Sequence, residues 1–165
     1  GRCVFALTMM LLYLSSTLFH GLPAGRGKRF FEKLDHAAIY LFIAGSYTAF
    51  AAPALQSLQA WTLFGLVWLA AAAGVWLTLS PRTMHPFLST ALYVAMGWLV
   101  LLAALPWIGQ VSATGMRLLV AGGVAYTAGA GPFLMSARLR YAHFAWHLFV
   151  MAGSGLHVAA TVSPA

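Results

Sequence analysis

The stretch that decides the fold is residues 60–79, which read AWTLFGLVWLAAAAGVWLTL. It contains no charged side chain, and a helix of about 20 residues spans a hydrocarbon core of about 30 Å. Similar apolar runs recur along the chain, so that the predicted spans are residues 3–20, 36–54, 60–79, 87–105, 117–135 and 143–162. The sequence therefore predicts an all-α, polytopic transmembrane bundle of six helices, with residues 1–165 forming one integral-membrane domain.

The composition agrees with lipid as the main solvent. The chain is 62% hydrophobic and only 7% charged, which is too few charges to solvate the surface of a soluble domain. A membrane β-barrel would instead alternate polar and apolar residues over short strands. Cys3 is the only cysteine, which excludes an intrachain disulfide framework and a thiolate metal cluster, and we expect it to be a buried small apolar residue.

The charges indicate an orientation rather than a nucleic-acid partner. Lys and Arg number 9 against 2 acidic residues, and they lie mainly in connections between apolar runs. These residues are Arg26, Lys28, Arg29 and Lys33 after the first span, Arg82 after the third, and Arg138 and Arg140 after the fifth. The positive-inside rule places these connections in the cytoplasm and both ends of the chain outside. We expect no cleavable signal peptide, because the first apolar run is too long for one.

Histidines in so apolar a chain predict a functional site. His143 and His147 are four residues apart, so one face of a helix presents both imidazoles. His20 ends the first span at the same predicted cytoplasmic depth, with Ser16 one turn before it and Asp35 at the start of the second span. A carboxylate beside three imidazoles is the composition of a catalytic zinc site.

Plainer interpretations stay open for each of these polar residues. A single histidine at a helix end is more often an interfacial anchor than a metal ligand, and we assign such roles to His36, beside Asp35, and to His85 in a loop. For His157 we expect an outer hydrogen-bonding or core role rather than direct metal binding. Asp35 could also be an N-cap for the second span. The glycine-rich stretch 121–131 predicts close helix packing rather than a nucleotide loop.

Three motifs carry a resemblance to a known family. Residues 15–20 read SSTLFH, residues 34–40 and 44–48 read LDHAAIY and AGSYT, and residues 143–150 read HFAWHLFV, followed by Gly153-Ser154 and His157. They resemble the signature motifs of the hemolysin III proteins, the bacterial branch of the progestin and adipoQ receptor family, which includes adiponectin receptors. The resemblance implies a seven-helix fold with an intracellular amino terminus, of which this chain is expected to lack the first helix.

The resemblance also implies the roles of five residues. His20, His143 and His147 would bind one Zn²⁺, while Asp35 and Ser16 would hold a water beside it. This arrangement suggests a zinc-dependent hydrolase of amide-linked lipids, similar to the ceramidase activity associated with the adiponectin receptors.

Two other functions are alternatives to the hydrolase. A membrane sensor or receptor would use zinc only as a structural link. A pore-forming cytolysin is not favoured, because no span carries a polar stripe along its full length. Membrane lipids, including a lipid amide substrate, are the expected partners, and the expected location is the bacterial inner membrane with the zinc site toward the cytoplasm.

Overall fold

The chain folds into six helices within the residues that the structure, a computed structural model, describes, namely 1–51, 55–80, 85–104 and 111–163. The helices are α1 (Arg2–Gly21), α2 (Arg26–Ala51), α3 (Leu58–Leu79), α4 (Pro86–Ala104), α5 (Ala113–Met135) and α6 (Ala142–Val162). No strand occurs in these described ranges. The prediction of an all-α helical membrane bundle is therefore confirmed.

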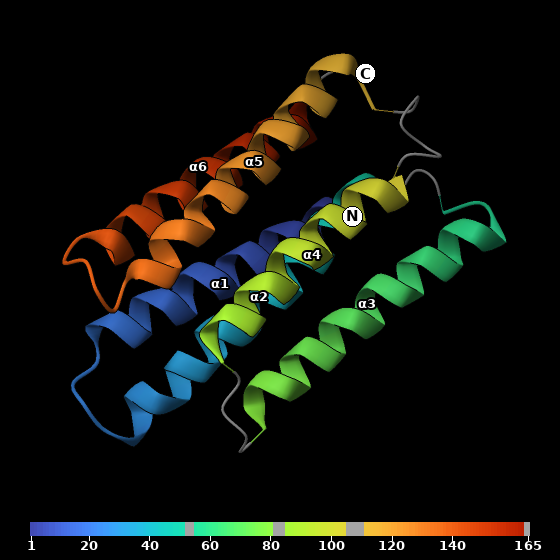
Figure 1. Cartoon of the computed structure of the whole chain (residues 1–165). Helices are drawn as coiled ribbons and strands as arrows, with labels where there is room; N and C mark the ends of the chain where they lie inside the picture. Colours follow the sequence, from blue (N-terminus) through green and yellow to red (C-terminus); the bar gives the residue numbers. More distant parts are fainter. Residues whose placement is uncertain (52–54, 81–84, 105–110, 164–165) are drawn as a thin grey trace. The chain divides into compact units, whose positions relative to one another are not determined.

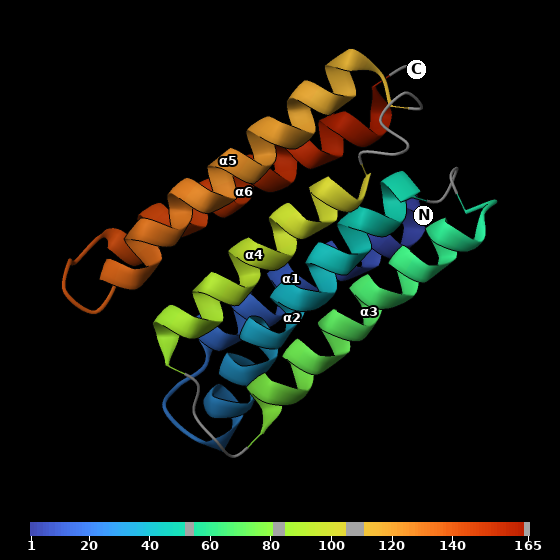
Figure 2. The same ribbon diagram turned by 45° about the vertical axis from the view of Figure 1, so that its right-hand side comes forward.

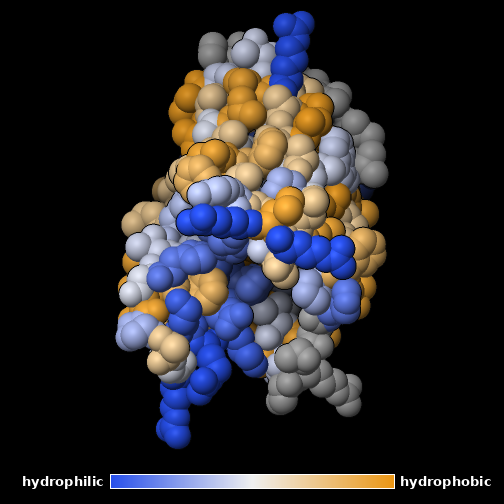
Figure 3. Space-filling view, turned by 60° about the vertical axis from the view of Figure 1, so that its left-hand side comes forward, coloured by the Kyte–Doolittle hydropathy of each residue, from blue (hydrophilic) through white to orange (hydrophobic). Residues whose placement is uncertain are grey.

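The outer surface exposes many large apolar side chains, as a lipid-facing surface should. Large side chains such as Leu58, Leu69 and Trp76 are 84%, 67% and 76% exposed, which would be unfavourable in water. Hydrophobic side chains cover much of the face seen in Figure 3, and hydrophilic ones gather in clusters. By length and composition, α1, α3, α5 and α6 can each cross a membrane, and membrane spans at α2 and α4 stay predictions.

Two expectations from the sequence need correction, the N-cap role of Asp35 and the burial of Cys3. The helix that contains the second predicted span begins at Arg26, ten residues before residue 36, because Arg, Lys and Glu are good helix formers that continue a helix beyond its apolar part. Asp35 consequently lies inside α2, and its prediction as an N-cap is wrong. Cys3 is exposed rather than buried, because it lies with Arg2 at the exposed start of α1.

By their internal contacts, the residues form two compact units, Gly1–Met84 and His85–Ala165. In the first unit, α2 packs against both α1 and α3 (Figure 1). Phe5 of α1 stacks on Phe42 of α2, with ring centroids 5.6 Å apart. Gly45 of α2 lies against Thr8, and Gly74 of α3 lies against the ring of Tyr40. Small residues therefore let the helices approach closely.

The second unit is built around the α5–α6 pair, whose helices lie side by side in both ribbon views (Figure 2). Glycines at this interface leave no room for a side chain. A Cβ added to Gly129 would lie 2.7 Å from Cβ of Phe149, and one added to Gly122 would meet the ring of His157. On α6, a Cβ at Gly153 would lie 2.7 Å from the ring of Tyr126. The close packing predicted for the glycine-rich stretch is confirmed.

A tryptophan–threonine hydrogen bond links two helices in each unit. Trp68 Nε1 of α3 donates to Thr48 Oγ1 of α2 at 3.1 Å, and Trp98 Nε1 of α4 donates to Thr127 Oγ1 of α5 at 3.0 Å. Each threonine hydroxyl in turn donates to the backbone carbonyl four residues earlier. Each indole N–H thus has a hydrogen-bond partner within the protein, as a polar group in a membrane interior requires.

Candidate metal centre

The strongest candidate for a metal centre is the histidine pair at the start of α6. His143 and His147 lie one turn apart and both are half-buried. Their Nε2 atoms are 3.1 Å apart, and the rings stand nearly perpendicular, with centroids 4.7 Å apart and an interplanar angle of 84°. The i and i+4 spacing therefore directs two nitrogen atoms to one point, as the sequence predicts.

This spacing fits a metal ion that binds nitrogen. Two imidazole nitrogens, each about 2.0–2.1 Å from a tetrahedral Zn²⁺, are separated by about 3.3 Å. The Nε2 separation of 3.1 Å is close to that value, so both rings could hold one ion with little movement. In the absence of an ion, the same approach is a hydrogen bond between the two rings, one Nε2–H donating to the other nitrogen.

In the first unit, α1 and α2 bring together the other predicted site residues, Ser16, His20 and Asp35. Ser16 donates a hydrogen bond to the Asp35 carboxylate, which lies just before the predicted span 36–54. Burial raises the pKa of Asp35 above its usual value, and the nearby charge of His36, the Ser16 hydrogen bond and the charge of His20 lower it in part. Asp35 is therefore a carboxylate with an increased affinity for protons.

His20 itself is exposed in the last turn of α1. Its ring lies beside that of Phe19, with centroids 4.6 Å apart. The structure thus groups the five predicted residues in two sets, the histidine pair in one unit and the Ser16–His20–Asp35 group in the other. Binding of one metal ion by all three histidines stays a prediction.

The remaining histidines occupy other environments. His36 Nδ1 bonds with the Glu32 carbonyl at 2.8 Å, which fits the predicted interface residue beside Asp35. His157 packs edge-on against Tyr126, with ring centroids 5.3 Å apart, inside the α5–α6 interface. That position agrees with the predicted core role.

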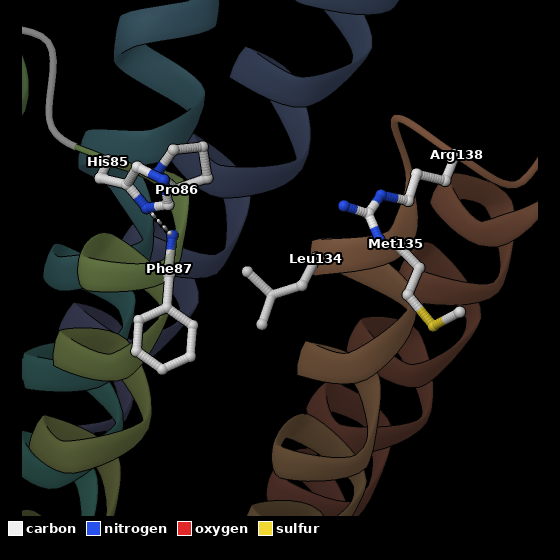
Figure 4. Close-up of a pocket in the computed structure, with 6 residues that line it drawn as sticks. All are labelled: His85, Pro86, Phe87, Leu134, Met135 and Arg138. Carbon is white, nitrogen blue, oxygen red and sulfur yellow. Dashed lines mark hydrogen bonds between the residues drawn. The ribbon is translucent and has the colours of Figure 1, made fainter.

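His85 accepts a hydrogen bond from the Phe87 amide through Nδ1 at 3.3 Å, just before α4. It also lines a pocket of about 360 Å³ in the second unit, together with Pro86, Phe87, Leu134, Met135 and Arg138 (Figure 4). No predicted metal ligand lines this pocket. The open, largely apolar space between the start of α4 and the end of α5 is therefore separate from the histidine pair.

Sequence reasoning missed the role of two lysines. Lys28 Nζ donates to the Leu22 carbonyl at 3.1 Å and lies 5.1 Å from the Phe19 ring centroid. Lys33 Nζ donates to the Leu79 and Ser80 carbonyls, at 3.3 and 3.2 Å. Each lysine thus stabilises a helix end, where carbonyls lack helical partners. Charge patterning predicts only that these residues face the cytoplasm. It does not indicate the Lys33 contact, because that contact joins residues far apart in the sequence.

The apolar surface, the four helices able to span a membrane and the paired imidazoles define a helical integral membrane protein with candidate metal-binding histidines. The sequence model of the family described as Haemolysin-III related matches residues 2–158, and the chain belongs to this family. The resemblance found in the three motifs is thereby confirmed.

Relatives from bacteria and animals agree with this assignment. The chain is 39% identical over 153 residues to Hemolysin-3 of Bacillus cereus, covering 93% of this chain and 69% of that protein. It is 38% identical over 151 residues to the Hemolysin-3 homolog of Bacillus subtilis (strain 168), covering 92% and 70%. The human Monocyte to macrophage differentiation factor is 26% identical over 163 residues, covering 93% and 66%. No solved structure matches the chain.

Proposed function

We propose that this protein is a zinc-dependent hydrolase that cleaves amide-linked lipids within the membrane. The observation that carries the proposal is the pair of Nε2 atoms on the first turns of α6, 3.1 Å apart and directed to one point. Imidazole nitrogens are borderline ligands that suit zinc better than magnesium or calcium. Two imidazoles on one helix leave other coordination positions for a third ligand and for water, as catalytic zinc sites require.

His20 is the third ligand in this proposal. It lies in the last turn of α1, while His143 and His147 lie in the first turns of α6. The basic residues that follow α1 and the arginines that precede α6 put both helix ends at the cytoplasmic face under the positive-inside rule. The family membership, which covers the motifs at both ends of the chain, supports the same set. The location proposed is the bacterial inner membrane.

In the proposed amide hydrolysis, the metal and the side chains of Asp35 and Ser16 in the first unit have different roles. When bound, zinc would polarise the amide carbonyl and make a nearby water more acidic. Asp35, whose pKa is raised by burial, accepts the proton from water and can return it to the leaving amine. The Ser16 hydroxyl donates to the same carboxylate and holds its orientation. The substrate amide enters from the lipid phase, since many large hydrophobic side chains are exposed on the surface.

The test compares wild-type protein with Asp35→Asn, both purified in detergent and loaded with zinc. Asparagine keeps the shape of the side chain but cannot accept the proton, so hydrolysis of ceramide and acyl-amide substrates should fall by about 100-fold or more. Metal content, measured by elemental analysis, should stay the same in both proteins, because Asp35 is not a proposed ligand.

His85→Ala is the matched control, since His85 lies outside the proposed site, and it should keep both activity and zinc. Equal hydrolysis by wild type and Asp35→Asn would contradict the proposal. Zinc binding without hydrolysis of any tested lipid amide in the wild-type protein would instead favour a structural metal in a membrane sensor.

A further inference from the structure

The first turns of α2 extend beyond the membrane-embedded part of the first unit. Lys33 Nζ donates to the carbonyls of Leu79 and Ser80, and α3, a candidate membrane span, ends at Leu79. Lys33 therefore lies at the edge of the hydrocarbon layer. Since α2 begins at Arg26, seven residues earlier, about 10 Å of helix continues outward from this level. The lipid headgroups occupy that layer, which is about 5–8 Å thick on each side.

One face of this extension combines positive charge with an exposed aromatic ring. Arg26, Arg29 and Phe30 have the spacing i, i+3 and i+4, so they are neighbours on the surface of α2 and span an arc of about 100°. Both arginines are exposed, and Phe30 is 60% exposed. Asp35 lies about 180° from Arg26 around the helix. The outward face is therefore distinct from the side that carries the Ser16–Asp35 hydrogen bond.

The two arginines differ from the neighbouring lysines in having no partner in the described part of the chain. Lys28 and Lys33 are held by backbone carbonyls, whereas the side chains of Arg26 and Arg29 make no hydrogen bond or ion pair there. Glu32 is three residues from Arg29 but does not pair with it. Two guanidinium groups one turn apart are thus available to an anionic group at headgroup level.

We propose that the Arg26–Arg29–Phe30 face of α2 binds the headgroup of an anionic phospholipid. A guanidinium presents a planar array of donors that matches phosphate oxygens, and two of them can bind the same phosphate. Phe30 packs against the glycerol and upper acyl region, which a free phosphate would not supply. Gly25, just before α2, has no side chain to cap the helix, so the first-turn amides of α2 add positive potential at the same place.

The proposal is tested by native mass spectrometry of the full chain released from detergent that contains equal amounts of phosphatidylglycerol and phosphatidylcholine. The wild-type protein should retain phosphatidylglycerol in preference to phosphatidylcholine. Each removed arginine should weaken this preference by about 5-fold, so Arg26→Gln/Arg29→Gln should weaken it by about 25-fold. Addition of soluble glycerol phosphate should not displace the retained lipid.

Arg2→Gln/Arg117→Gln is the matched control, because it removes the same charge from two exposed arginines elsewhere in the chain. It should keep the wild-type preference, and circular dichroism should show the same helix content in all three proteins. An unchanged preference in Arg26→Gln/Arg29→Gln would overturn the proposal, as would an equal loss in the control. Displacement by glycerol phosphate would overturn it too, by showing a site for a free phosphate.

Discussion

The α1–α2 pair and the α5–α6 pair are both closely packed, but they position their polar groups in different ways. In α5–α6, both candidate ligands, His143 and His147, are on one helix, and their 3.1 Å approach follows from the helical repeat. In α1–α2, the Ser16–Asp35 hydrogen bond joins two helices, so it exists only when they pack correctly. The first arrangement is local, whereas the second is tertiary.

This difference predicts how each of the two polar groups responds to substitution. A local pair keeps its geometry as long as the helix forms, even when a neighbouring helix shifts. A tertiary pair loses its geometry with any change in helix packing. Substitutions should therefore act on the histidine pair mainly by removing ligand atoms, and on the Ser16–Asp35 group also through the packing of α1 on α2.

The largest effect is expected from removal of one member of the histidine pair. In His143→Ala, the remaining imidazole has no partner on its own helix, and zinc affinity should fall by more than about 100-fold, because even outer-shell groups contribute 10–100-fold. Competition with a chromogenic chelator measures the affinity. His85→Ala should bind zinc as the wild type does, and an unchanged affinity in His143→Ala would exclude the pair as ligands.

The next largest effect concerns the packing of α5 on α6. In Gly129→Ala, the new Cβ would lie 2.7 Å from Cβ of Phe149, and we expect a loss of about 1–3 kcal/mol in the free energy of unfolding. Gly131→Ala is the matched control, because nothing lies within 4 Å of its added Cβ. It should be neutral or stabilising by up to about 1 kcal/mol. Unfolding in mixed detergent micelles, followed by circular dichroism, measures both; equal stabilities would contradict the packing.

A smaller effect is expected from Ser16→Ala in the tertiary pair. The Ser16 hydrogen bond favours the ionised carboxylate and lowers the pKa of Asp35, so its removal should move that pKa further upward. The carboxyl band in infrared spectra, titrated with pH, should then disappear at a higher pH than in the wild type. The Asp35→Asn variant serves to assign the carboxyl band to Asp35, because the band should be absent from its spectrum. A shift in the opposite direction would show that Ser16 does not donate to Asp35.

The smallest effect is expected at the end of α3. In Lys33→Gln, the charged donor to the Leu79 and Ser80 carbonyls is replaced by a neutral, shorter one, with an expected cost of about 0.5–1 kcal/mol in the free energy of unfolding. Arg117→Gln, with an equal charge change at an exposed position, should cost less than about 0.5 kcal/mol. The same unfolding assay compares the two variants, and a cost for Lys33→Gln no larger than for Arg117→Gln would argue against the helix-end role.

These contrasts also explain how much of the molecule could be predicted from its sequence. Apolar runs such as residues 60–79 depend only on local composition, so α3 is found at Leu58–Leu79, within two residues of the prediction. The His143–His147 pair could be predicted equally well from the sequence, because the i and i+4 spacing fixes its geometry. Helix spacing and predicted membrane depth already placed Ser16 and Asp35 near His20, and the motif resemblance added their roles beside the metal.

What the sequence did not reveal depends on contacts between distant residues or on polar helix formers. Hydropathy marks the part of a helix that lies in lipid, and it therefore missed the start of α2 at Arg26 and led to the incorrect N-cap assignment of Asp35. The contact of Lys33 with Leu79 joins two helices, and no periodicity in the chain indicates it.

The tryptophan–threonine bonds make each unit observable by light. Trp68 and Trp98 donate to threonine hydroxyls in separate units, and an indole that donates a hydrogen bond in an apolar medium emits at a longer wavelength than one that does not. The chain has six tryptophans, so two single-tryptophan variants are needed. One keeps Trp68 and the other keeps Trp98, with the five other indoles replaced by phenylalanine, and each then carries one reporter for its own unit. Fluorescence of the two variants would therefore reveal whether the first and second units unfold together or one after the other.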